Sequence, residues 1–208
     1  MFKLQYLYFK INNKIFNIYN MKPTNKNPCG YYLSDRDYLL HMIPHHQVAI
    51  DISLKLQKKS KTPWMQSLLR ELIWVQGREI AIMKDFLSLP DSVSNDMEKM
   101  NKVYIKTLAE FTEGTEDPNA KCLPEFFDPE LHNHHLEHME LSDKMYIDHM
   151  IPHHQVAIDM SKRLLMHTNN AFMISFAYRI IRSQQKEIFM MNNMLKSNTF
   201  NWNSDILA

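Results

Sequence analysis

The chain contains 208 residues, of which 45% are hydrophobic and 23% are charged, and its formal net charge is +1. These values predict a soluble globular protein with one sizeable core, and they exclude the strongly basic surface on which nucleic-acid binding depends. Three glycines against sixteen methionines favour long helices over sheets joined by glycine-rich turns.

The first twenty residues are basic and aromatic, but lysine, glutamine and asparagine interrupt every apolar run. No run reaches the length of a signal peptide or a membrane span. We therefore expect no secretory signal and no transmembrane segment, which favours a cytoplasmic location. Residues 1–33 are expected to be a poorly ordered or surface-lying extension, in which Met21 is an alternative start. Cys29 and Cys122 are too few for a disulfide framework.

The first pair of predicted helices is marked by residues that begin or interrupt helices. Ser34 has the spacing of a capping box and predicts the start of the first helix. Thr62 before a proline predicts the start of the second, which runs to about Leu89. Pro44, like Pro152 in a later helix, lies inside a helical pattern and should kink or restart it.

The rest of the chain contains a less regular middle and a second helical pair. The middle is predicted as a helix at 96–111, a loop at 112–129 and a short helix at 130–141. Ser142 then begins a third helix, and a fourth begins near Asn170 and fades after Lys196.

An internal duplication organises these helices. Residues 41–51, HMIPHHQVAID, recur without a change as residues 149–159. The match resumes on the following helix, where Ile73, Gln76, Glu79, Ile80 and Met83 recur as Ile181, Gln184, Glu187, Ile188 and Met191. Each repeat is therefore a helical hairpin. The predicted domain spans 34–198, with repeat one at 34–90, an insertion at 91–141 and repeat two at 142–198.

The M-I-P-H-H-Q-x-A-I helix followed by a Q-x-x-E-I-x-x-M helix resembles the domain of unknown function 305 family, and both signatures occur twice. The resemblance covers roughly 34–196 and implies an all-α, ferritin-like four-helix bundle. Some members of the family are similar to copper-binding proteins of the cell envelope. The resemblance implies no established enzyme activity.

Eight side chains on the two M-I-P-H-H helices are candidate metal ligands: His41, Met42, His45, His46, His149, Met150, His153 and His154. Residues four apart share one face of a helix, so histidines and methionines form adjoining stripes. His46 and His154 should face the core and approach one another across a twofold axis, whereas His45 and His153 should lie at the margin of the core. Imidazole and thioether ligands together favour copper, with zinc or another divalent ion as an alternative. Because histidine must be deprotonated to coordinate, binding should weaken as pH falls through about 6.

The second helix of each hairpin supplies candidate auxiliary residues: Gln76, Glu79, Met83, Gln184, Glu187 and Met191. Glu79 and Glu187 border the inward stripe and are placed to accept hydrogen bonds from histidines. An architectural alternative remains open. The same histidines, glutamines and glutamates would then only lock the two hairpins in register.

A further histidine cluster, HNHHLEHME at residues 132–140, has no counterpart in the repeats. His134 and His138 could form an auxiliary metal-capture patch. With Glu137 they also match the H-x-x-E-H pattern of zinc hydrolases, a weaker alternative. Iron oxidase chemistry is disfavoured because the chain contains no E-x-x-H motif.

The sequence therefore predicts a non-enzymatic protein that binds copper through duplicated Met/His helices, for storage, buffering or tolerance. Its expected partner is a metal ion, and a homo-oligomer is compatible with the sequence. The alternative is a structural or interaction module without metal.

Overall fold

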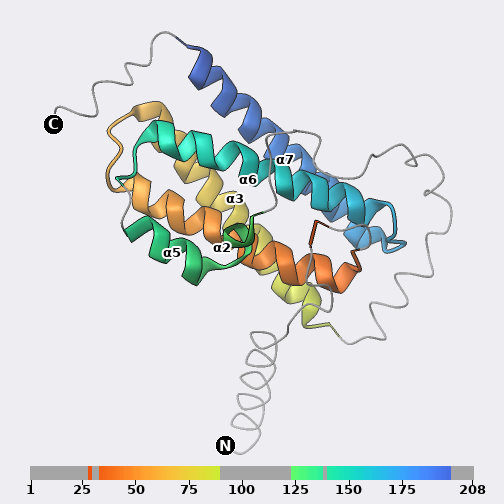
Figure 1. Ribbon diagram of the computed structural model, residues 1–208. Helices are drawn as coiled ribbons and strands as arrows, with labels where there is room; N and C mark the ends of the chain where they lie inside the picture. The colour runs from red at the N-terminus through yellow and green to blue at the C-terminus, as the bar shows by residue number, and fades with distance from the viewer. Residues whose placement is uncertain (1–27, 30–32, 90–122, 138–139, 198–208) are drawn as a thin grey trace, which may run out of the picture.

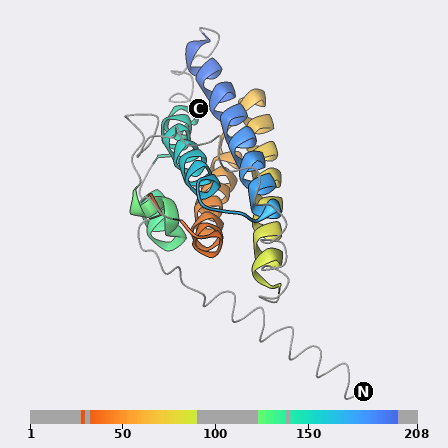
Figure 2. The ribbon, with the colours of Figure 1, turned by 90° about the vertical axis from the view of Figure 1, so that its right-hand side faces the viewer.

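The computed structural model describes residues 28–29, 33–89, 123–137 and 140–197. Four long helices pack side by side as a bundle (Figures 1 and 2): α2 at Asp35–Gln57, α3 at Pro63–Leu87, α6 at Asp143–Leu165 and α7 at Ala171–Lys196. No strand occurs in the described parts of the chain. The predicted all-α four-helix bundle is confirmed, whereas the helix expected at 96–111 lies outside the described residues.

The helices begin where the capping residues predict. The side chain of Ser34 accepts a hydrogen bond from the backbone N–H of Asp37 at 3.1 Å. Asn170 accepts from two backbone N–H groups at the start of α7. Thr62 instead donates its hydroxyl proton to Asp143 at 2.6 Å, which ties the start of α3 to the start of α6.

The two internal prolines do not interrupt their helices. The prediction that Pro44 and Pro152 would each kink or restart a helix was wrong about the restart, because α2 and α6 continue through them. Proline removes one N–H from the helix, and the packed neighbours on both sides hold the remaining turns in place.

Two short elements of the insertion lie against α2. They are the 3-10 helix η2 at Pro124–Phe127, within the predicted loop, and α5 at Pro129–Glu137 (Figure 1). The amide of Asn133 on α5 donates to the carboxylate of Asp51 on α2 at 3.2 Å. These two elements thus cover α2 on one side of the bundle.

Equivalent hydrogen bonds join α2 to α6. Tyr38 bonds to Ser161 at 2.8 Å, and Tyr146 bonds to Ser53 at 2.7 Å. Each serine donates its own proton to a carbonyl in its helix, so each tyrosine must be the donor. The two bonds exchange the roles of the repeats, as an approximate twofold axis requires.

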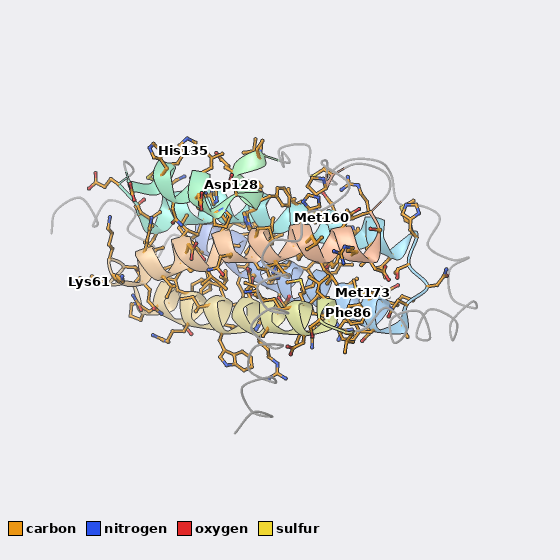
Figure 3. All side chains as sticks on the ribbon, turned by 90° about the horizontal axis from the view of Figure 1, so that it is seen from below. Lys61, Phe86, Asp128, His135, Met160 and Met173 are labelled. Carbon is orange, nitrogen blue, oxygen red and sulfur yellow. The ribbon has the colours of Figure 1, made fainter. Side chains whose placement is uncertain are left out.

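The core consists of two apolar clusters with a polar layer between them. One cluster contains Met42, Met83, Met160 and Met173, and the other contains Met150, Met191 and, on α3, Leu68, Leu69 and Leu72. Figure 3 shows Met160 and Met173 near the end of the bundle away from Lys61. Each long helix crosses from one cluster to the other through buried polar residues: His45 and His46, Gln76 and Glu79, His153 and His154, and Gln184 and Glu187.

Two further features concern membrane-spanning helices and the N-terminal cysteine. None of the described helices is both long enough and apolar enough to cross a membrane. Cys29 is disulfide-bonded and packs against the first apolar cluster.

Candidate metal centre

The two repeats meet in the polar layer through His45 on α2 and His153 on α6. Their ring centroids lie 3.7 Å apart with an interplanar angle of 31°. His45 is 1% exposed and His153 is 0% exposed. The prediction that this pair would lie at the margin of the core was therefore wrong.

The cause is the cover that the insertion provides. The Phe126 ring lies 4.9 Å from the ring of His153, and the Phe127 ring lies 5.2 Å from that of His45. Phe127 also contacts His41 edge-on at 5.9 Å. Sequence reasoning missed both phenylalanines. The available signal was an apolar pair between Pro124 and Pro129 in a segment treated as a loop.

His46 and His154 were predicted to approach one another, but each binds the glutamate of its own hairpin. Nε2 of His46 lies 2.9 Å from Glu79, and Nε2 of His154 lies 2.5 Å from Glu187. The ring contact between the repeats belongs instead to the other histidine pair. The predicted acceptor positions of the two glutamates agree with these bonds, because helix spacing places each carboxylate opposite its histidine.

A hydrogen bond defines the tautomer of His45. Its Nε2 lies 3.1 Å from the backbone carbonyl of His153. A carbonyl only accepts, so Nε2 carries the proton, and in a neutral ring Nδ1 carries the lone pair. Nδ1 of His45 is buried and has no hydrogen-bond partner, and neither nitrogen of His153 has one. An unpartnered buried polar group costs about 1 to 3 kcal/mol, so this arrangement is expensive for architecture alone.

Other polar atoms in this layer are also buried without a hydrogen-bond partner. They are Nδ1 of His46, Nδ1 of His154, Oε1 of Gln76 and both side-chain polar atoms of Gln184. The thioethers of Met42 and Met150 are fully buried, one in each adjoining apolar cluster. Met83 and Met191 divide between the clusters in the same way.

Burial keeps the central histidines neutral. It lowers the pKa values of His45 and His153 well below the ordinary range, and positive charge on neighbouring histidines would lower them further. Burial likewise lowers the pKa of His149 to about 4. Neutral imidazole is the form that coordinates metals, so these side chains have the protonation state that coordination requires near neutral pH.

The present orientation of the rings does not itself enclose an ion. Among the described residues, no three histidine, cysteine or acidic side chains are arranged to hold a metal. Imidazole lone pairs lie in the plane of the ring, whereas His45 and His153 face one another. Chelation by this pair therefore requires one ring to turn. The donor chemistry fits copper, since the layer offers neutral imidazoles flanked by thioethers.

The histidines of the insertion divide between surface and interior. His134 and Glu137 are exposed on α5, and His138 lies outside the described residues. His132, which was not among the predicted site residues, is 3% exposed and lies 5.0 Å from His149 between ring centroids. The structure thus directs a different histidine of this cluster toward the bundle.

Known proteins are similar to this chain in sequence and in fold. The model of the domain of unknown function family DUF305 matches residues 32–87, which contain α2 and α3. The first hairpin of the chain is thus similar to the DUF305 family. A DUF305 fragment from Deinococcus radiodurans superposes with a TM-score of 0.51 at 17% identity, covering 84% of this chain and 99% of that one, and shows a shared fold.

Two copper-bound structures resemble this protein over most of its length. CopM in the Cu(II)-bound form is 27% identical, with a TM-score of 0.54, and the match covers 81% of this chain and 99% of CopM. CopM in the Cu(I)-bound form is 26% identical, with the same TM-score, over 83% and 99%.

A curated relative matches a shorter region. The uncharacterized protein L153 of Acanthamoeba polyphaga mimivirus is 46% identical over 55 residues, which is 26% of this chain. The match spans about a third of that relative, 36% of its length.

Proposed function

We propose that this protein binds copper in the polar layer of the bundle, with His45 and His153 as its central ligands, and that it stores, buffers or detoxifies the metal without catalytic turnover. The observation that carries the proposal is the state of this pair. Both rings are buried and neutral, and between them they leave three nitrogen atoms without a hydrogen-bond partner. The copper-bound CopM structures, which share the fold, support the choice of metal.

The remaining predicted ligands divide by position. Met42 and Met150 border the layer from opposite apolar clusters, so each can offer a thioether to an ion held by the central pair. His41 and His149 precede the central histidines by one helical turn and adjoin the same phenylalanine cover. Thioethers favour Cu(I), while histidine also accepts Cu(II) and Zn(II).

His46 and His154 have a mainly structural part in this proposal. Each is fixed by a buried glutamate, which orients the ring and leaves Nδ1 available. Gln76 and Gln184 are buried one helical turn before these glutamates, on the same helices.

The architectural alternative draws support from the same bonds. The His–Glu pairs and the Tyr–Ser pairs hold the helices in register without any metal. The alternative does not explain why His153 is buried with both nitrogens unpartnered.

Titration of the full chain with Cu(I) against a chromophoric chelator separates the two functions. The test variant is His45→Gln with His153→Gln, which removes the central imidazoles. The matched control is Tyr38→Phe with Tyr146→Phe, which removes two buried polar groups from the same helices but no candidate ligand. Copper binding lost in the histidine variant and kept in the control supports the proposal. Equal binding in both variants would leave the central pair an architectural role.

A further inference from the structure

A second pair of histidines lies at the edge of the bundle, where α5 meets α6. The rings of His132 and His149 have centroids 5.0 Å apart and planes inclined by 35°. Nε2 of each ring is buried and has no hydrogen-bond partner. Two unpartnered imidazole nitrogens from different elements therefore lie close together outside the central pair.

The surrounding contacts fix the position of this edge pair. Asn133, next to His132, donates to Asp51 on α2 and anchors α5. Phe126 contacts His149 edge-on at 5.3 Å. These contacts hold the two rings against each other in the absence of any direct bond between them.

The edge pair is also nearer to solvent than the central pair. His149 is only partly buried, and Glu125 lies close enough for its charge to act on that ring. Glu125 itself pairs with His135 at 3.3 Å, and His135 lies on the outer face of α5 (Figure 3). A carboxylate at this edge favours the approach of a cation.

Ring contacts connect the edge pair to the centre. The ring of His149 lies 5.8 Å from that of His153, which in turn lies 3.7 Å from that of His45. His149 therefore adjoins both pairs. An ion held by the edge pair could pass to the central pair by exchanging one ligand at a time.

We propose that His132 and His149 form a separate copper site, at which the ion first binds before it passes to His45 and His153. This inference rests on the proposed copper-binding function and adds α5 as a ligand-bearing element. The edge site offers two imidazoles and lacks the thioethers that both apolar clusters provide at the centre. It therefore binds copper more weakly than the centre and exchanges it faster. The insertion is thus part of the metal pathway as well as a cover.

A first test follows the histidine rings of the wild-type full chain by nitrogen NMR during titration with Ag(I), a diamagnetic substitute for Cu(I). We expect the Nε2 resonances of His132 and His149 to shift together, and those of the central pair to shift as well. If the central pair shifts while His132 is unchanged at saturation, the edge site is refuted and the central site stands. If no histidine resonance shifts, the histidine-based function fails as a whole.

A second test uses His132→Phe, which keeps an aromatic ring against His149 and removes its nitrogens. The control is His135→Gln on the same helix, because the side chain of His135 is 56% exposed. Loss of a residue that hydrogen-bonds to a metal ligand lowers metal affinity by about 10- to 100-fold. Loss of a direct ligand should therefore lower the copper affinity of the edge site by roughly 100-fold. Loading of the central pair should also slow.

These outcomes separate the two proposals. Wild-type stoichiometry and loading rate in His132→Phe would overturn the edge site and leave the central one intact. His132→Gln, a smaller polar replacement, provides the same comparison if the phenylalanine variant does not fold. Absence of copper binding in the wild type would instead refute the function on which the inference rests.

Discussion

The side chain of His45 donates a hydrogen bond to the backbone carbonyl of His153 at 3.1 Å, but the reverse bond is not formed. The side chain of one repeat is thus tied to the main chain of the other, and the approximate twofold symmetry breaks at its centre. His45 has one nitrogen satisfied and one available, whereas His153 has neither satisfied. The two residues occupy the same position in identical sequence repeats, yet His153 carries the larger energetic penalty.

This asymmetry predicts that His153 lowers the free energy of unfolding of the metal-free protein. His153→Leu, which is of similar volume, removes two unpartnered polar atoms from the core. We expect the metal-free protein to gain about 1 kcal/mol in free energy of unfolding, because the desolvation penalty disappears. Copper affinity should fall sharply. Denaturant unfolding of the apo proteins measures the first effect, and a loss of several kcal/mol would argue for an architectural role.

His46 should behave in the opposite way. His46→Ala leaves the buried carboxylate of Glu79 with only the hydroxyl of Ser183, at 3.5 Å, and breaking a buried pair costs about 3 to 5 kcal/mol. His135→Ala is the control, since that side chain is largely exposed. Thermal and denaturant unfolding should show a large loss for the first variant and little change for the second. Equal stability of the two variants would contradict the structural role assigned to the His–Glu bond.

The pH dependence of copper binding should differ from the sequence-based expectation. Ordinary histidines would release copper as pH falls through about 6. Burial lowers the pKa values of His45 and His153 well below the ordinary value of 6.5, and that of His149 to about 4. Copper should therefore remain bound at pH 5, and its release should require a lower pH than ordinary histidine ligands would. Equilibrium dialysis across this range provides the measurement, and complete release by pH 6 would contradict it.

The same pKa shifts determine how acid affects the apo fold. For His149, the folded pKa of about 4 lies below the unfolded value of 6.5, so the unfolded chain binds more protons between these values. This contribution to stability is fully present above pH 6.5 and is lost as pH falls toward 4. His132, whose pKa burial also lowers to about 4, acts in the same direction. Urea unfolding should show a free energy of unfolding that falls between pH 6.5 and 4, and a rise would contradict the assignment.

The symmetric tyrosine bonds allow a test of the twofold arrangement. Tyr38→Phe and Tyr146→Phe each remove one buried hydroxyl that donates to a serine of the other repeat. Each should cost about 1 kcal/mol, because each removes one hydrogen bond and leaves the serine with its own helical acceptor. Unfolding free energies that differ by more than about 2 kcal/mol between the variants would show that the environments are not equivalent.

The fold was largely predictable because its signals are local. Ser34, Thr62, Ser142 and Asn170 each precede a helix at the predicted place, since caps and prolines act within one turn. Helical spacing also predicted that Glu79 would accept from a histidine, and the structure identifies that histidine as His46. Local patterns were sufficient wherever both partners belonged to one hairpin.

The candidate site was predictable only in part, because its burial depends on a segment outside the repeats. A helical pattern tells which face of α2 carries His45, but not that Phe127 covers that face. The same gap explains the choice of His134 over His132. Which histidine of α5 turns inward depends on how the short helix is anchored through Asn133, a long-range contact.

The most direct measurement of the central claim is a crystal structure of the Cu(I)-loaded full chain, with data collected at the copper absorption edge. The account predicts an anomalous peak in the polar layer, about 2 Å from a ring nitrogen of His153, with one ring of the His45–His153 pair turned from its position in the present structure. Peaks confined to exposed histidines such as His134 and His135, with the central rings unmoved and unliganded, would contradict it.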